Sequence, residues 1–247
     1  MSTAVYAYAV VDAHRALPLA EGIGRGPLRL VAAGRVAAVA GPVEVGDFEG
    51  DALERNLARS GWLEEVVRAH EDVVEALAAE GSVLPMRFGS IFSDERGLRA
   101  MLEENAATLS GLLDRLRGRV ELGVTVRKTR SGSDPDRPGP PGSGRDYLRR
   151  RQAELRAAGE ASAAAGELAG RLHAALAEGA EEASLLEPRR SDPSVILTAS
   201  YLVPVGEVDR FCERADALGR SHPCLIELTG PWPPYSFASI DVAGAHC

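Results

Sequence analysis

The sequence predicts an α+β protein of two domains, an N-terminal mixed α/β-sheet domain over residues 1–118 and a C-terminal ferredoxin-like domain over residues 119–247. Three observations underlie this prediction of the fold, the third of which marks a loop inserted into the second domain. At 247 residues, the chain is long enough for two domains that each bury a core. Strand-like and helical segments alternate without the glycine-rich phosphate loop of a doubly wound sheet. After residue 126 the composition changes abruptly to glycine, proline, serine, aspartate and arginine.

The first half of the chain predicts a sheet followed by long helices. Alternating and β-branched residues favour strands, and Gly34 stands between two such runs, where a turn is needed. Apolar residues at helical spacing, with Asp51 as an N-cap, favour helices. The predicted elements are, in order, strands over 5–11, 28–33 and 35–40, a helix over 51–81, a short edge or bulged strand over 83–92, and a helix over 93–118.

The second half predicts two βαβ-like passes. Its elements are a strand over 121–126, a long helix or pair of helices over 146–186, a strand over 194–203, a helix over 208–218 and a strand over 224–228. This order fits a ferredoxin-like sandwich better than a doubly wound sheet. Residues 127–144 are expected to form a mobile loop inserted into the domain, because their composition cannot build a packed core.

The charge balance argues against two classes of partner. The formal net charge is −8 and the sequence pI is about 5.3, whereas binding to nucleic acid or to an anionic membrane depends on positive charge. No apolar run approaches the roughly 18 to 20 residues that cross a bilayer, and no basic segment followed by an apolar one opens the chain. We therefore expect a cytoplasmic protein that binds neither nucleic acid nor a lipid membrane.

The sequence shows no catalytic or metal-binding pattern. The cysteines Cys212, Cys224 and Cys247 form no CxxC pair. His70 lies on the apolar face of the first long helix without a second histidine three or four residues away, which predicts a buried, hydrogen-bonded side chain. There is no G-x-S-x-G segment, and residues 21–26 are predicted to form a flexible glycine-rich loop, not a phosphate cradle. We expect no enzyme activity, cofactor or metal.

Two sets of basic residues have no obvious role in a core. Arg87 lies in an otherwise apolar segment, where a guanidinium needs a carboxylate or carbonyl partner. We favour an ion pair that locks the domains over capture of a ligand. A basic region in this acidic chain comprises Arg127, Lys128, Arg130, Arg149, Arg150 and Arg151. This region is either a solvated helix start beside a loop or an electrostatic contact for an acidic partner.

Residues 229–237 read Thr-Gly-Pro-Trp-Pro-Pro-Tyr-Ser-Phe, with three prolines and three aromatic residues. Proline restricts its own φ and the residue before it, so Trp232 and Tyr235 are expected in a stiff, extended path. Two interpretations remain open. The segment is either a rigid strap whose aromatics cap the protein's own core or a preformed surface that contacts a partner.

Three segments resemble the gas vesicle protein family GvpL/GvpF. They are residues 84–92 (LPMRFGSIF) after the helix bearing His70, residues 144–148 (GRDYL) after a variable loop, and residues 228–237 (LTGPWPPYSF). They occur in the family's order, and the resemblance spans nearly the whole chain. It implies a two-domain α+β architecture whose C-terminal half is a modified ferredoxin-like fold, and a non-enzymatic accessory role in gas vesicle formation.

The resemblance also implies partners, namely the small hydrophobic shell protein GvpA and other gas vesicle accessory proteins, and a location at the gas vesicle. A shell subunit with exposed apolar surface aggregates unless a soluble partner holds it. We therefore hypothesise a protein-contact surface that comprises Arg87, Phe88, Trp232, Tyr235 and Phe237. An alternative of a different class is a regulatory module that binds a small ligand on the ferredoxin-like domain.

Overall fold

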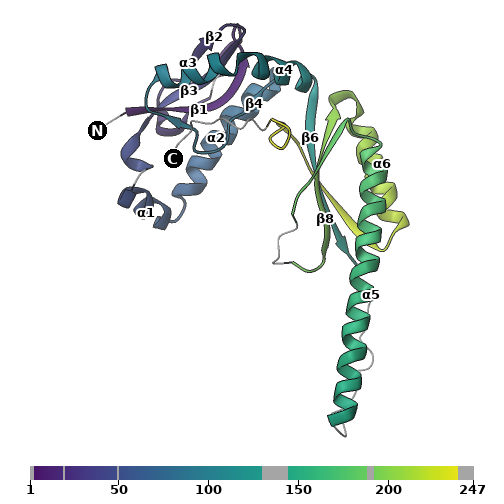
Figure 1. The fold of residues 1–247 in the computed structure, drawn as a ribbon. Coiled ribbons are helices and arrows are strands. Elements are labelled where there is room, and N and C mark those ends of the chain that lie inside the picture. The colour runs from purple at the N-terminus through teal and green to yellow at the C-terminus, as the bar shows by residue number, and fades with distance from the viewer. Residues whose placement is uncertain (1–2, 19, 49, 130–143, 188–191, 239–247) are drawn as a thin grey trace. The chain divides into compact units, whose positions relative to one another are not determined.

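The computed structural model describes residues 3–18, 20–48, 50–129, 144–187 and 192–238 (Figure 1). The chain forms two compact units. Unit 1 holds Met1–Glu121 and Pro231–Cys247, and unit 2 holds Leu122–Gly230. The division into residues 1–118 and 119–247 stays a prediction. The observed grouping differs from it chiefly at the end of the chain, where residues from Pro231 onward belong with unit 1.

Unit 1 is built on an antiparallel sheet whose central strand is β1. The strands are β1 (Thr3–Asp12), β2 (Arg29–Ala33), β3 (Val36–Glu44), β4 (Leu84–Pro85) and β5 (Ile91–Phe92). Their order is β2-β3-β1-β4, and β5 also pairs with β1. The predicted hairpin around Gly34 is confirmed, and the φ of 63° at this glycine is one that other residues adopt at a cost.

The prediction of two continuous helices for this half is wrong, because each predicted helix is observed as two shorter helices. The observed helices are α1 (Gly50–Ala58), α2 (Trp62–Ala79), α3 (Glu95–Glu104) and α4 (Ala106–Leu116). Gly61, with a φ of 90°, separates the first pair, and Asn105, whose amide donates to the Met101 carbonyl at 2.8 Å, separates the second. The apolar spacing continues across both breaks, so periodicity alone does not reveal them.

Helices cover both faces of this sheet (Figure 1). On one face, Val73 and Leu77 of α2 pack against Tyr6 and Tyr8 of β1 in a continuous apolar cluster. On the other face, α3 and α4 pack against β1, β2 and β3. Every residue of β1 from Ala4 to Val11 is therefore buried, which explains why the strand is apolar on both sides.

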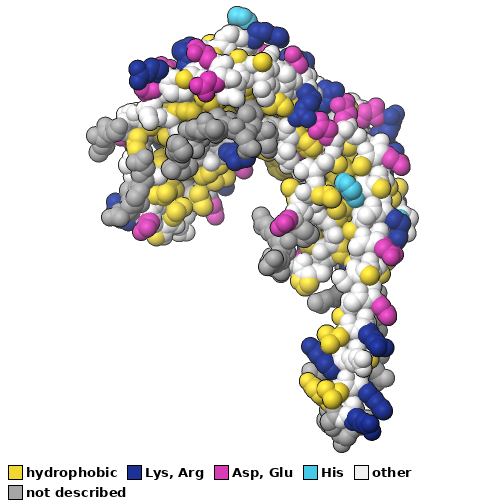
Figure 2. All heavy atoms as spheres, viewed as in Figure 1, with side chains coloured by type: hydrophobic (Ala, Val, Ile, Leu, Met, Phe, Trp, Pro, Cys, Tyr) yellow, Lys and Arg dark blue, Asp and Glu magenta, His cyan; other side chains and the backbone are white. Residues whose placement is uncertain are grey.

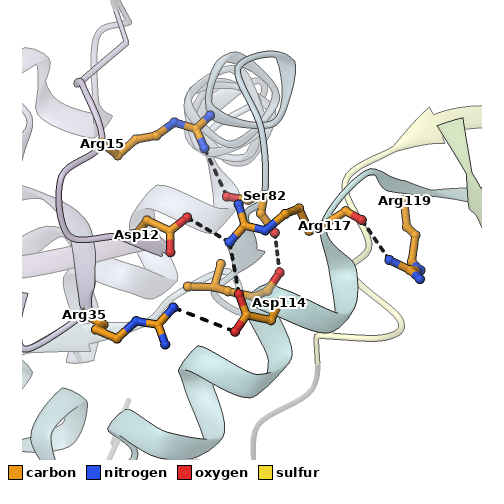
Figure 3. Close-up of polar contacts among 8 residues, drawn as sticks. Asp12, Arg15, Arg35, Ser82, Asp114, Arg117 and Arg119 are labelled. Atoms are coloured by element: carbon orange, nitrogen blue, oxygen red, sulfur yellow. Dashed lines mark hydrogen bonds and ion pairs between the residues drawn. The ribbon is translucent and has the colours of Figure 1, made fainter.

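Polar contacts fix the end of α4 against the sheet (Figure 3). Arg117 pairs with Asp12 at 3.3 Å and with Asp114 at 3.1 Å, while Arg35 lies 3.9 Å from Asp114. These pairs are exposed and each contributes little. The buried Ser82 hydroxyl donates to a backbone carbonyl of α4 at 2.7 Å. These contacts join the end of α4 to β1 and to the segment before β4 within unit 1.

Unit 2 has the element order βαββαβ of a ferredoxin-like fold. Its elements are β6 (Arg119–Lys128), α5 (Gly144–Ala177), β7 (Glu182–Leu185), β8 (Val195–Pro204), α6 (Val208–Ser221) and β9 (Cys224–Trp232). The sheet order is β7-β8-β6-β9. Strand β7 is missing from the sequence prediction. Residues 130–143 of the loop predicted over 127–144 lie outside the described residues.

The core of unit 2 lies between its sheet and its two helices. Leu172 and Leu176 of α5 and Phe211 of α6 pack against Tyr201 of β8. The His173 Nδ1 lies 2.9 Å from the Tyr201 hydroxyl, which satisfies a phenol that burial would otherwise isolate. Only the last third of α5 takes part, because its buried side chains begin at Leu168.

Candidate functional site

The turn between β4 and β5 carries the first of the predicted site residues. Tyr6 lies beneath this turn, and its hydroxyl accepts a hydrogen bond from the Gly89 N–H at 3.0 Å. The Ser90 N–H and hydroxyl both donate to the Arg87 carbonyl, at 3.1 and 2.7 Å. Gly89 has a φ of 85°, a conformation that favours glycine. The tip of the turn is therefore held in one conformation by backbone and side-chain bonds.

His70 lies at the centre of the layer below the turn. It is 3% exposed, and its Nδ1 lies 3.1 Å from the Tyr6 hydroxyl. Burial lowers the pKa of His70 to about 4, and the Met86 backbone opposes this shift in smaller measure. The imidazole is therefore neutral at pH 7, and the predicted buried, hydrogen-bonded histidine is confirmed. Tyr8, stacked on His70 at 5.8 Å, accepts from the Ile23 N–H at 2.7 Å.

Phe88 lies on this layer with part of its ring exposed to solvent. The ring centroid is 6.0 Å from that of His70 and 6.5 Å from that of Tyr6, and the side chain is 43% exposed. Arg87 next to it is also exposed. Among the described residues, no carboxylate forms an ion pair with Arg87, so the expected domain-locking pair finds no support there. The turn thus displays an aromatic ring and a guanidinium side by side.

The segment after β9 is fastened to unit 1. Glu121 is buried, and its carboxylate accepts from the Ser236 N–H at 2.7 Å and from the Ser236 hydroxyl at 2.6 Å. The Arg115 guanidinium donates to the Phe237 carbonyl at 2.7 Å. Pro233 and Pro234 are buried, and Phe237 is 7% exposed. The Phe237 ring therefore anchors the segment and is not available to a partner in this conformation.

The other two aromatics of the segment remain accessible. Trp232 is 44% exposed and Tyr235 is 38% exposed. Partial burial raises the pKa of Tyr235, and the carboxylates of Glu71, Glu75 and Glu121 add to the shift. The phenol therefore stays protonated and able to donate a hydrogen bond. Each of the two interpretations of this segment therefore fits a part of it. Pro233, Pro234 and Phe237 are buried, as a strap requires, whereas Trp232 and Tyr235 are exposed, as a contact surface requires.

Two of the predicted residues, Phe88 and Tyr235, lie near one stretch of α2. Phe88 contacts His70, and Tyr235 lies in the electrostatic field of Glu71 and Glu75, within the next turn and a half of that helix. We use the name aromatic surface for the exposed residues Arg87, Phe88, Trp232 and Tyr235.

The alternative function, binding of a small ligand on the ferredoxin-like domain, requires a pocket, and two hollows are relevant to it. In unit 2, a pocket of about 260 Å³ lies where the turn after α5 meets the end of β8 and the start of α6, and charged side chains line it, including Glu207, Arg210 and Arg214. Its size falls below the roughly 300–1,000 Å³ of ordinary ligand sites. A groove of about 1000 Å³ lies in unit 1 instead, along α2. The sequence prediction missed this groove, although residues 21–25 of the predicted glycine-rich loop form part of its lining.

The described part of the chain also lacks two kinds of feature. No group of three or more histidine, cysteine, aspartate or glutamate side chains there is arranged to hold a metal ion. Among the helices described, none combines the length and apolar character needed to cross a membrane.

The fold and surface define a class of protein with two α+β units, one of them ferredoxin-like, and a rigidly held set of exposed aromatics. A family model for "Gas vesicle synthesis protein GvpL/GvpF" matches residues 4–239. The chain therefore belongs to the GvpL/GvpF family, whose function lies in gas vesicle formation. The family resemblance drawn from the sequence segments is confirmed.

Individual relatives agree with this assignment. The chain is 37% identical over 238 residues to gas vesicle protein L of Streptomyces sp. (strain CB03234), covering 92% of this chain and 89% of the relative. It is 29% identical over 244 residues to gas vesicle protein F2 of Halobacterium salinarum, covering 96% and 93%. The crystal structure of GvpF from Anabaena sp. PCC7120 superposes with a TM-score of 0.69 at 18% identity, covering 97% and 98%, which supports the α+β fold.

Proposed function

We propose that this chain binds the shell protein GvpA, and other accessory proteins, during gas vesicle formation, and that the aromatic surface of unit 1 makes the contact. One observation carries the proposal. Phe88 is 43% exposed although its turn is fixed from below through the bond between Gly89 and Tyr6. An aromatic ring held in place loses little conformational entropy when a partner covers it.

The chemistry of the surface fits an apolar partner with polar edges. Phe88 and Trp232 offer apolar area, and aromatic and arginine residues are the types most enriched at the energetic centres of interfaces. Arg87 and the Tyr235 hydroxyl supply hydrogen-bond donors at the rim. Phe237 contributes by anchoring the segment that carries Trp232 and Tyr235. The binding takes place in the cytoplasm or at the growing vesicle.

Co-expression with the shell protein tests the proposal. The wild-type chain should keep more shell protein in the soluble fraction and co-purify with it. The double substitution Phe88→Ala/Trp232→Ala should lose most of this capture because it removes the apolar centre of the surface. Leu57→Ala is the matched control, since Leu57 is an exposed apolar residue of α1 outside the aromatic surface. Equal capture by the double variant and by the wild type would reject the aromatic surface as the contact.

A further inference from the structure

The first half of α5 lies outside the core of unit 2. Side chains that pack against the sheet begin at Leu168, whereas residues 151–164 are all exposed. At about 1.5 Å per residue, the segment from residue 145 to residue 164 is about 30 Å long. Figure 1 shows it extending past the end of the sheet. Lys128 of β6 donates a hydrogen bond to the Ala161 carbonyl at 3.1 Å, but a helix whose side chains are not packed is marginally stable in water. This half therefore gains stability from any surface that covers it.

This exposed half is amphipathic. Tyr147, Leu148 and Leu155 are each more than half exposed, and Leu148 and Leu155 are seven residues apart and so lie on one side of the helix. Arginines flank this apolar line on both sides, with Arg145, Arg149 and Arg156 on one flank and Arg151 on the other. We call these seven residues the α5 stripe. Figure 2 shows apolar and basic side chains side by side on this part of the helix.

The α5 stripe is also the basic part of an acidic chain. Residues 145–156 contain five arginines and two carboxylates, a net charge of +3, whereas the whole chain carries −8. The sequence left open whether this basic region is a solvated helix start or a contact for an acidic partner. Exposed leucines within it favour the contact, because a merely solvated face does not require them.

Unit 1 carries a hollow with the opposite charge. The groove of about 1000 Å³ runs along α2, and its apolar lining includes Phe48, Trp62 and Val66, with the first two rings 5.7 Å apart. Five carboxylates line it, Glu65 and Asp72 from α2 and Glu21, Glu44 and Asp47 from other segments of unit 1. Arg25 and Arg68 also line it, which leaves a formal charge of −3. We call it the acidic groove.

We propose that the α5 stripe of one copy of this chain docks into the acidic groove of a second copy. The two surfaces are complementary in residue type as well as in sign. Both combine apolar and charged side chains, so the leucines meet the groove's apolar lining while the arginines face its carboxylates. The inference goes beyond the proposed function, because the partner is another copy of the chain and the shell protein takes no part.

The helix and the groove are different surfaces of the molecule, so two modes of association follow from the contact. Two copies that each place their helix in the other's groove form a closed two-fold dimer, whereas copies that give the helix to one neighbour and the groove to another form rings or open rows.

Sedimentation velocity of the purified full chain tests the proposal. The wild type should associate as its concentration rises to about 100 µM, and added salt should weaken the association because it screens exposed charges. Arg149→Glu/Arg156→Glu should weaken self-association at least about tenfold by placing like charges opposite each other. Arg171→Glu is the matched control, a charge reversal at an exposed position on the packed half of α5.

A charge-swap experiment identifies the partner surface. Glu65→Arg/Asp72→Arg in the groove should also abolish self-association. A mixture of the two double variants should associate again, because the unaltered basic helix of the groove variant meets the unaltered acidic groove of the helix variant, and the acidic helix of the one meets the basic groove of the other. A wild type that stays monomeric at every concentration would overturn the proposal. So would helix variants that associate as well as the Arg171→Glu control, or a mixture of the two double variants that fails to form a complex.

Discussion

The aromatic side chains of unit 1 fall into a buried set and an exposed set that lie close together. Tyr6 and Tyr8 are fully buried and hydrogen-bonded, to His70 and to the backbone. Phe88 and Trp232 are more than 40% exposed, although the segments that carry them are fixed by neighbouring bonds. Exposure here is therefore not a sign of a loose chain. The buried set should govern stability, and the exposed set should govern binding.

The largest expected effect on stability comes from the anchor of the terminal segment. Phe237→Ala removes a buried ring and should lower the free energy of unfolding of unit 1 by about 3 to 5 kcal/mol. Both tryptophans, Trp62 and Trp232, belong to unit 1, so tryptophan fluorescence in a urea titration reports its unfolding. Phe237 is buried as Tyr6 and Tyr8 are, so a loss no greater than that caused by Phe88→Ala would contradict the claim that the buried aromatics govern stability.

Acid should lower the stability of unit 1 through His70, which packs among the buried aromatic side chains. The folded state lowers the pKa of this imidazole to about 4, so the unfolded chain, with a pKa near 6.5, takes up the proton first. The stabilising contribution is therefore complete above about pH 6.5 and is lost as the pH falls toward 4, by about 3 kcal/mol in total. His70→Gln should flatten this part of the stability curve in urea titrations between pH 7 and pH 4.

The control for this pH effect is His14→Gln, because His14 is exposed. This substitution should leave the pH dependence unchanged. If His70→Gln and the wild type lose stability in parallel from pH 6.5 to 4, His70 is not the titrating group that links acid to the fold.

A smaller effect is expected where the terminal segment is hydrogen-bonded. Glu121→Gln keeps the shape of the side chain but removes the charge that receives both bonds from Ser236. It should lower stability by about 1 to 3 kcal/mol and speed amide hydrogen exchange at Ser236 and Phe237. Glu227→Gln is the control, since this exposed carboxylate pairs with Arg127 at the surface of unit 2 and should change stability by less than about 1 kcal/mol.

Sequence patterns predicted most strands of both units and the ferredoxin-like class of the second half, because alternation and helical spacing survive where a core imposes them. They missed β7, since its residues Glu-Ala-Ser-Leu include no β-branched or aromatic side chain. They also merged α1 with α2, because one glycine turn does not interrupt the apolar spacing. The misses therefore fall where tertiary contacts, not local preference, decide the structure.

The candidate site was predictable only in part. The proline-aromatic segment and the turn at Arg87 and Phe88 are visible as unusual residue types in the sequence. Contacts between residues far apart in the chain bring Phe88 and Tyr235 to the same stretch of α2. Such contacts also decide that Phe237 is buried while Trp232 is exposed. The acidic groove likewise assembles carboxylates from separate segments, and no short motif marks it.

The most direct test of the surface claim is a binding titration of the shell protein, solubilised as monomer, against folded variants. Phe88→Ala/Trp232→Ala should weaken binding about tenfold or more, as truncation of central interface residues does, while lowering stability by only about 1 to 2 kcal/mol. Leu57→Ala should bind as the wild type does. An unchanged Kd for the double variant, with its fold verified by circular dichroism, would contradict the claim that these exposed aromatics contact the shell protein.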